Sequence, residues 1–343
     1  MNTVSLQSSR LGRYPERDFS PILDTMNTYH GVEREIKDEI MSTDIFIRIE
    51  SDVHPEEVLV ADIDQCFDLF RSFEARFSRF KADSELSRFN ARHTEKQTVS
   101  EEFLTLLHKS GEYHLFTEGL FNPTILPALE QEGYVKSRLE GFTSPDMPTA
   151  NDSPILSLSN IDIDEKMLTV DTHGAKIDFG GIGKGYIIDQ VVLTLRSRGY
   201  TDFLIDAGGD LYAAGKNQMK QYPAWTIDIE HPKYPEQSLA TLMLSDMAAT
   251  TSGINRRHWI NGTQVKHHII DPRTGQSAET DIVSATVIAE TAALADVLAK
   301  SILILGHEAG EAFALRKNIA AILANADGIV ATTPRLESFL WKA

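Results

Sequence analysis

The sequence is poor in cysteine, has no excess of basic residues and contains no long apolar run. Cys66 is the one cysteine among 343 residues, so no disulfide forms within the chain, which fits a reducing compartment. It lies in an apolar helical pattern, which favours a buried structural thiol over a nucleophile. The formal net charge of −17 argues against nucleic acid as the main partner, because phosphate backbones require a basic surface.

Signals for membranes and export are also lacking. No stretch of about 18 apolar residues occurs, so we expect no membrane span. The first residues show neither a basic region followed by an apolar run nor a lipoprotein cysteine, so we expect cytoplasmic localisation. What is present is an ordinary globular composition, with 42% apolar and 24% charged residues, and a length that allows ample core.

Strand and helix patterns follow one another irregularly. Residues 1–38 are polar and are predicted to form an N-terminal extension, with a single domain over 39–343. Strands or hairpins are predicted at 41–51, 156–171, 225–232, 238–245, 281–290 and 319–334. Helices are predicted at 58–80, 101–119, 291–306 and 308–318, and a polar surface loop at 131–154. No regular βαβ rhythm is present, which favours an α+β or an irregular α/β layer fold.

The chain is organised around residues 176–215, which read as strand, glycine turn, helix, strand and second glycine turn. The first turn contains Gly180, Gly181, Gly183 and Gly185 and opens a helix that ends at Gly199. Such a turn directs several backbone N–H groups, and the positive end of the helix, at one place suited to phosphate. Lys184 adds a mobile positive charge. The alternative is a tight connection that uses its glycines for backbone geometry alone. The turn is neither a GxGxxG fingerprint nor a P-loop.

Nine segments of the sequence, in the same order, resemble the motifs of the ApbE family of FAD:protein FMN transferases. They are MST, FSRFKADSELSRFN, GLFNPTILPAL, DFGGIGKGYIID, DAGGDLYAAG, WTIDIEHP, ATTSGINRR, HHIIDPRTG and AALADVLAK. The resemblance covers roughly residues 41–334. It implies an α+β fold similar to the T-fold, with mixed sheets flanked by helices and an active-site cleft between lobes.

The reaction that the resemblance implies is a phosphoryl transfer. A Thr or Ser hydroxyl of a target flavoprotein, in a D-(S/T)-GAT-like motif, attacks the FMN-side phosphorus of FAD, and AMP leaves. Charge develops on the phosphoryl oxygens, so electrostatic stabilisation carries most of the catalysis. Two other activities stay open, namely hydrolysis of FAD to FMN and AMP, and binding of FAD without catalysis.

The resemblance also implies roles for single residues. The catalytic candidates are His268, as a base or phosphate contact, together with Asp296 and Lys300. The carbonyl of Gly183 and the carboxylate of Asp296 are the expected Mg²⁺ ligands, since both are oxygen donors. His267 is expected to be a polar residue at a strand edge. The residues expected to bind the flavin cofactor FAD are Met41, Asn90, Gly181, Lys184, Asp210, Thr251, Ser252, His268 and Asp271.

The sequence departs from the family pattern at Lys300, where a Thr side chain usually contacts the metal. Asp296 and Lys300 lie four residues apart on one helix face, and a protonated lysine cannot ligate Mg²⁺. Lys300 either replaces the cation, pairing with Asp296 and the diphosphate, or swings away from a metal site with fewer protein ligands. A third interpretation is a tolerated surface lysine in a member without activity. Ser42, Asn122 and Asn255 stand where Gly, Asp and Tyr are usual, which leaves the mode of flavin-ring binding open.

Overall fold

A computed structural model describes residues 30–135, 155, 158–255, 257–261 and 264–342. Within these residues the main element is an eight-stranded sheet in the order β1-β2-β6-β7-β10-β15-β16-β17, and all neighbouring strands in it are antiparallel. Its strands are β1 (His30–Ile40), β2 (Thr43–Ser51), β6 (Asp202–Ala207), β7 (Asp210–Ala214), β10 (Met247–Gly253), β15 (Ser284–Ala289), β16 (Ala320–Asn325) and β17 (Gly328–Thr332). The large sheet is thus antiparallel rather than mixed, because tight turns such as the one between β6 and β7 join only antiparallel neighbours.

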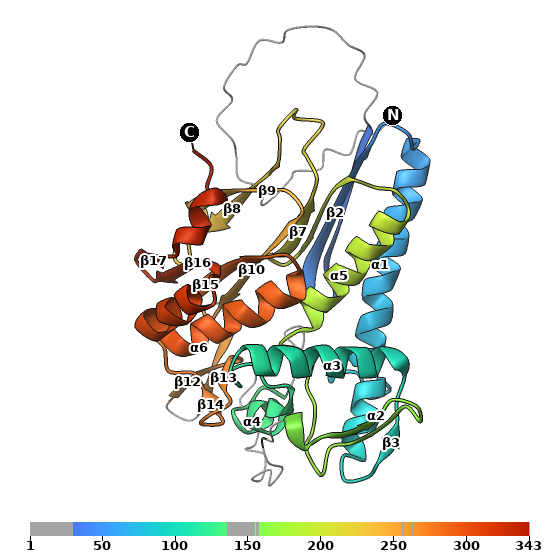
Figure 1. Ribbon diagram of the computed structural model, residues 1–343, viewed down its shortest axis with the longest axis vertical. Coiled ribbons are helices and arrows are strands. Elements are labelled where there is room, and N and C mark those ends of the chain that lie inside the picture. The colour runs from blue at the N-terminus through green and yellow to red at the C-terminus, as the bar shows by residue number, and fades with distance from the viewer. Residues whose placement is uncertain (1–29, 136–154, 156–157, 256, 262–263, 343) are drawn as a thin grey trace, which may run out of the picture.

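Helices cover one face of this sheet, and a β-hairpin covers the other (Figure 1). The helices are α1 (Glu56–Phe77), α5 (Gly183–Ser197) and α6 (Ala292–Arg316), and the hairpin is β8 (Trp225–Glu230) with β9 (Ser238–Leu244). The alternation of side chains along a strand explains this arrangement. On β2, Ile45 and Ile47 are fully buried in the core on the helical face, while Phe46 packs into the core on the hairpin face. The two large apolar cores therefore lie on opposite sides of the sheet.

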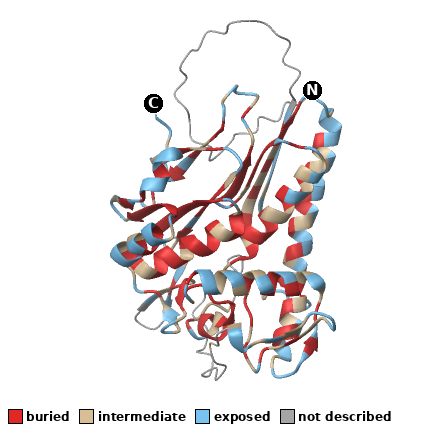
Figure 2. Cartoon of the chain, in the orientation of Figure 1, coloured by how far each residue is buried: buried red, intermediate tan, exposed pale blue. Residues whose placement is uncertain are grey.

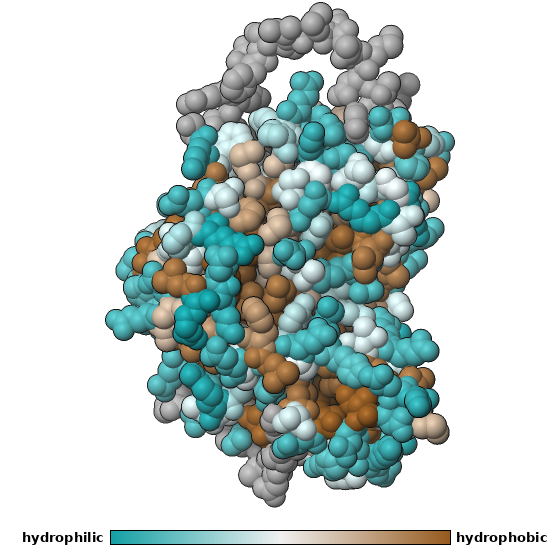
Figure 3. Space-filling model, in the orientation of Figure 1, coloured by the Kyte–Doolittle hydropathy of each residue, from teal (hydrophilic) through white to brown (hydrophobic). Residues whose placement is uncertain are grey.

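A smaller region of short elements lies below these layers in the view of Figure 1. Its helices are α2 (Glu85–Ala91), α3 (Glu101–Phe116), η1 (Pro123–Ile125), α4 (Leu126–Gln131) and η3 (Leu158–Asn160), and η4 (Pro334–Ser338) lies near the C-terminus. The remaining strands are β3 (Gln97–Thr98), β4 (Asp162–Asp164), β5 (Thr169–Asp171), β11 (His258–Asn261), β12 (Gln264–His267), β13 (Ile270–Asp271) and β14 (Gln276–Ser277). Figure 2 shows α6 buried over most of its length, whereas α3 presents exposed positions to solvent. Figure 3 shows apolar residues gathered in a hollow in the lower part of this face.

The N-terminal boundary differs from the sequence prediction. Residues 30–38, expected to belong to a polar extension, form most of β1, which pairs with β2 along its length. Val32 is buried and Ile36 is partly buried, but the polar Arg34 between them interrupts the apolar alternation. Arg34 instead forms an ion pair with Asp64 of α1 at 3.6 Å, a contact that no local pattern reveals. Residues 1–29 lie outside the described part of the chain.

Several local predictions are confirmed. Ser84 caps α2 by accepting a hydrogen bond from the backbone N–H of Ser87 at 2.9 Å. The hairpin predicted over 156–171 is present as β4 and β5. The break predicted at Gly306 is also present: this residue has φ 76°, and helical structure continues beyond it to Arg316.

The interpretation of Cys66 as a structural thiol is supported as well. Cys66 is fully buried in α1, and burial raises the pKa of its thiol to about 12, so the nucleophilic thiolate is not populated near neutral pH. In the described part of the chain, no helix combines the length and the apolar character needed to cross a membrane.

Candidate active site

The glycine turn leads from a buried extended segment into α5. Ile177 and Phe179 anchor the segment in the core, and the backbone N–H of Gly180 donates to Asp178 at 2.6 Å. Asp178 is itself paired with Arg79 at 2.9 Å in a buried ion pair. Among the described residues, no side chain caps the start of α5 at Ile182. The first amides of a helix have no partners within the helix, so this end can receive an anion.

Close packing fixes the start of α5 against the start of α6. A Cβ placed on Gly185 would lie 2.4 Å from the carbonyl oxygen of Ala292, so only glycine fits there. Asp189 of α5 accepts hydrogen bonds from the backbone N–H groups of Ala292 and Ala293, at 2.7 and 3.1 Å. Because both contacts involve backbone atoms, the first turns of α6 hold a defined position beside the glycine turn.

Two lysine–aspartate pairs meet at this junction. Lys300 and Asp296, one turn apart on α6, form an ion pair, and Lys184 of α5 pairs with Asp210 at the start of β7. Both aspartates are almost completely buried. The side chain of Lys300 passes beside Gly181, with its Cδ 4.0 Å from where a Cβ on this glycine would lie. The four charged groups, from two helices and one strand, thus surround one side of the glycine turn.

This cluster contains buried oxygen atoms that no described residue satisfies. Oδ2 of Asp296 and Oγ1 of Thr250 have no hydrogen-bond partner among the described residues. Thr250 lies directly opposite Asp210 in the pairing of β10 with β7. Burial raises the pKa of Asp296, Asp210 raises it further, and the two lysines oppose the shift. A buried carboxylate oxygen without a donor is costly, so the polar arrangement is incomplete as it stands.

The residues predicted to hold Mg²⁺ do not fit a divalent cation in this arrangement. One carboxylate oxygen of Asp296 is engaged by the ammonium of Lys300, and the ammonium of Lys184 acts on the same carboxylate. Gly183 is the first residue of α5, where a carbonyl accepts a bond within the helix. The described residues include no group of three or more His, Cys, Asp or Glu side chains that could hold a metal. A cation here would stand beside two ammonium groups.

His268 has the properties of a neutral base. Burial lowers the pKa of its ring well below the ordinary value, and the positive charges of Arg257 and Lys300 lower it further. Its ring nitrogen Nδ1 lies 3.4 Å from the carbonyl oxygen of Arg257, which can only accept, so Nδ1 carries the proton. Nε2 is then the acceptor nitrogen. The ring keeps partial solvent exposure and lies within electrostatic reach of the Lys300 ammonium.

Other predicted cofactor residues have local structural partners. The backbone N–H of Met41 donates to Glu74 at 2.8 Å in the tight turn between β1 and β2. The side-chain amide of Asn90 makes two hydrogen bonds to the backbone of Ile177, at 2.7 and 2.8 Å. Asn90 therefore positions the segment that leads into the glycine turn. Flavin contacts for Met41 and Asn90 stay predictions.

The last three predicted residues lie on β10 and β13. Thr251 is exposed and its hydroxyl lies 2.9 Å from that of Thr286, whereas Ser252 is buried. Asp271 is buried, and its carboxylate accepts hydrogen bonds from two side-chain nitrogens of Arg273, at 2.7 to 3.1 Å. Its flavin contact, like those of Thr251 and Ser252, stays a prediction. Ser42, where the family pattern has glycine, has φ 53°, the left-handed conformation that glycine adopts most readily.

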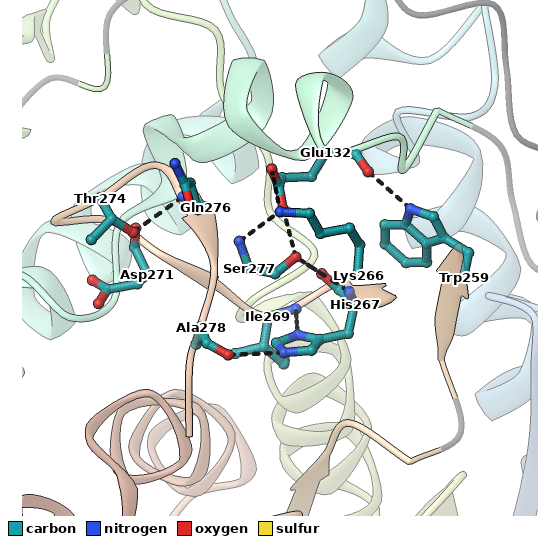
Figure 4. A network of polar contacts seen from close by, with 10 residues as sticks. All are labelled: Glu132, Trp259, Lys266, His267, Ile269, Asp271, Thr274, Gln276, Ser277 and Ala278. Carbon is teal, nitrogen blue, oxygen red and sulfur yellow. Dashed lines mark hydrogen bonds and ion pairs between the residues drawn. The ribbon is translucent and has the colours of Figure 1, made fainter. Parts of the chain in front are cut away.

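Sequence reasoning missed a buried polar network beside His268, which is drawn in Figure 4. Its centre is Glu132, whose Oε2 accepts from Lys266 at 2.9 Å and from the backbone and hydroxyl of Ser277 at 3.0 and 2.8 Å. The carbonyl of Glu132 also accepts from Trp259 at 2.8 Å. The polar 131–154 stretch was predicted to be a surface loop, but Glu132 is buried; residues 136–154 lie outside the described part. Its partner Lys266 lies 134 residues away in the sequence, so no local pattern could reveal the pair.

His267 belongs to this network and agrees with its predicted structural role. Its Nε2 lies 3.0 Å from the carbonyl oxygen of Ala278, and its Nδ1 accepts from the backbone N–H of Ile269 at 3.3 Å. Both ring nitrogens are therefore used by the backbone. Burial lowers the pKa of His267, so the ring is neutral near pH 7.

The fold and the site together define a class: an α+β protein in which a glycine-opened helix and two lysine–aspartate pairs lie together, with a neutral histidine within electrostatic reach of one lysine. The model of the ApbE family matches residues 41–323, and the chain belongs to the ApbE family. The FAD:protein FMN transferase of Vibrio cholerae is 28% identical over 270 residues, covering 78% of this chain and 79% of the relative. That of Treponema pallidum is 27% identical over 274 residues, covering 74% of each chain.

Solved structures give the same result. The flavin transferase ApbE from Vibrio cholerae superposes with a TM-score of 0.73 at 26% identity, over 91% of this chain and all of that one. The ApbE protein from Thermotoga maritima superposes with a TM-score of 0.78 at 22% identity, over 91% and 100% of the two chains, and supports the fold alone. The T-fold likeness and the cleft between lobes stay predictions.

Proposed function

We propose that this protein is an FAD:protein FMN transferase that attaches FMN to a Thr or Ser hydroxyl of a target flavoprotein, in a D-(S/T)-GAT-like motif. The observation that carries the proposal is the meeting of the glycine turn with Lys184, Lys300 and His268. Donors for phosphate oxygens and a neutral proton acceptor are the two requirements of such a transfer. The transferase relatives that cover most of the chain support the choice of reaction.

In this mechanism the diphosphate of FAD lies at the start of α5. Backbone N–H groups and the positive helix end bind its oxygens, and the ammonium groups of Lys184 and Lys300 balance the charge that develops during transfer. Burial strengthens these interactions, since the cluster is shielded from water. The hydrogen bonds from the backbone N–H groups of Ala292 and Ala293 to Asp189 join the starts of α6 and α5 beside this site.

The transfer itself breaks one bond and forms one. The hydroxyl oxygen of the target bonds to the FMN-side phosphorus, and the bond from that phosphorus to the bridging oxygen breaks. AMP leaves with the bridging oxygen, and the hydroxyl proton passes to Nε2 of His268, which is neutral and available. No oxidation or reduction takes place.

The test is incubation with FAD and an acceptor flavoprotein, read by in-gel flavin fluorescence and by AMP release. We expect covalent flavin on the acceptor, and none on an acceptor whose target Thr is replaced by Ala. AMP release that is independent of the acceptor would instead support FAD hydrolysis. Retained FAD without any AMP release would support a non-catalytic binder.

A variant at the glycine turn tests where FAD binds. A Cβ on Gly181 would lie 3.0 Å from the ring of Phe121 and beside Lys300, so Gly181→Val should displace both and weaken FAD binding by at least about tenfold. Gly111→Val is the matched control, because a Cβ on Gly111 meets nothing within 4 Å. Equal FAD affinity in a folded Gly181→Val protein and in the control would rule out this binding site.

A further inference from the structure

We propose that Lys300 takes the place of a divalent cation on Asp296, so that this chain binds the FAD diphosphate with little dependence on Mg²⁺. The proposal rests on the proposed function, since it concerns the same site. It rests equally on a difference between this chain and the family pattern. The pattern predicts a metal ion on Asp296, but in this chain the ammonium of Lys300 occupies that place.

The position of Lys300 is well determined by its neighbours. Its ammonium lies on Asp296, one helical turn earlier, and its aliphatic chain passes beside Gly181 and so follows the glycine turn. Lys184, within the turn, is held by Asp210. Two ammonium groups therefore lie near the start of α5, which no side chain caps among the described residues, and both come from helices whose packing leaves no room for a side chain at Gly185.

Counting charges shows why Lys300 matters. Lys184 balances Asp210 and Lys300 balances Asp296, so these two ion pairs together carry no net charge. Without Lys300 the cluster would be negative by one charge, in a buried place where charge interactions are strong. A threonine at this position would then require an added cation to bind the same anion.

The unsatisfied oxygen of Asp296 is a second, independent sign that the cluster receives a ligand. Oδ2 of Asp296 is buried and has no donor among the described residues, and neither has Oγ1 of Thr250 nearby on β10. When FAD binds, a ligand hydroxyl or an accompanying water molecule can donate to Oδ2. Lys300 has three N–H donors and can contact a phosphate oxygen while it stays bonded to Asp296.

The experiment measures FAD affinity by fluorescence quenching and by calorimetry, in EDTA and across a Mg²⁺ titration. We expect the affinity of the parent protein to differ by no more than about threefold between the two conditions. Lys300→Thr should bind at least about tenfold more weakly in EDTA and recover with Mg²⁺, because it loses a charge-assisted contact and frees Asp296. Lys300→Ala should show the loss in EDTA as well.

Lys317→Thr is the matched control, since Lys317 caps the far end of the same helix and pairs with Glu118 at 3.4 Å, away from the site. It should behave as the parent does. If the parent requires Mg²⁺ for FAD binding as strongly as Lys300→Thr does, the inference is wrong while the proposed function stands. If no protein binds FAD in any condition, both are wrong.

Discussion

Two lysine–carboxylate pairs with buried carboxylates, Lys266–Glu132 and Lys300–Asp296, differ in how many hydrogen bonds their carboxylates accept. Lys266 and Glu132 form the first pair, where one carboxylate oxygen accepts three hydrogen bonds (Figure 4). Lys300 and Asp296 form the second, where Oδ2 accepts none from the described residues. The carboxylate of the first pair is fully engaged within the fold, whereas that of the second keeps one oxygen without a donor among the described residues.

The pKa values of the two carboxylates follow this difference. Burial alone would raise the pKa of Glu132, but hydrogen bonds from Lys266 and Ser277 bring it below its ordinary value. Burial raises the pKa of Asp296, and one ammonium contact does not overcome it. Functional sites often keep such imperfect pairs, because the missing partner is the ligand. Variants of the residues in and beside each pair test this comparison.

The largest expected effect is a loss of reaction rate at His268, which its neighbour His267 should not share. His268→Ala should lower the rate of AMP release by about 10²–10⁴-fold while FAD still binds, because a positioned base is lost. His267→Gln is the control on the network side. It should lower stability by roughly 1 kcal/mol for the hydrogen bond it loses and leave the rate within a few-fold. Single-turnover AMP release and thermal denaturation give the two readouts.

The pH profile of the same reaction adds a second check. A base works in its neutral form, and burial lowers the pKa of His268 well below 6.5, so the rate should stay constant as the pH falls through 6.5. A rate that already falls above pH 6.5, or an His268→Ala rate close to that of the parent, would make this histidine structural.

A smaller effect is expected from neutralising each carboxylate. Glu132→Gln should cost about 1.5–3 kcal/mol of unfolding free energy at pH 7, since a buried charge loses its charge-assisted partner. Asp296→Asn should cost less, because ionised Asp296 is disfavoured by burial. The folded pKa of Glu132 is lowered, so its contribution is present above the unfolded value of 4.5 and is lost as the pH falls through the folded pKa.

Urea denaturation at pH 7 and pH 4 measures both variants. The comparison fails if Asp296→Asn proves the more destabilising of the two at pH 7. It also fails if the cost of Glu132→Gln is the same at both pH values, because pH 4 lies below the unfolded pKa of 4.5, where the contribution of ionised Glu132 is already reduced.

Local sequence patterns were enough to predict most elements and the glycine turn that opens α5. The glycines of the 180–185 turn, the cap at Ser84 and the break at Gly306 each reflect a conformational need of a few neighbouring residues. The spacing of Asp296 and Lys300 placed both on one helix face, and their pairing was one of the interpretations that the sequence left open.

What the patterns could not give depends on contacts between distant segments. Glu132 is polar in a polar stretch, and only its partners Lys266 and Ser277, more than a hundred residues later, make it a buried centre. The start of β1 was missed because Arg34 finds its partner on α1. The flavin contact of Asn90 stays a prediction, but the two bonds of its amide to the backbone of Ile177, 87 residues away, could not be read from the local pattern. Each case is a tertiary contact that overrides the local signal.

Asp189 provides the smallest and most discriminating test, because it is a partly buried carboxylate with two backbone donors and, among the described residues, no ion pair with a lysine or arginine. It accepts from the backbone N–H groups of Ala292 and Ala293, yet burial still raises its pKa to about 6. If a charged donor is what keeps the pKa of Glu132 low, the two backbone amides alone should leave the pKa of Asp189 raised. The folded pKa lies above the unfolded value of 3.8, so the folded state binds the proton more tightly between these values. The stability contributed by protonated Asp189 is therefore complete below pH 3.8 and is lost as the pH rises through about 6.

Asp189→Asn cannot ionise, so the parent should lose stability relative to this variant as the pH rises from about 4 to about 7. The expected change in the difference is about 1–2 kcal/mol, with allowance for the partial exposure of the side chain. Urea denaturation of both proteins across this range measures it, and Asp206, whose pKa burial also raises to about 6, is common to both and cancels. A difference that is constant with pH would mean that backbone amides hold a buried carboxylate as well as a lysine does. Since Glu132 and Asp296 both pair with a lysine, the contrast between them would then be assigned to the number of hydrogen bonds that each accepts.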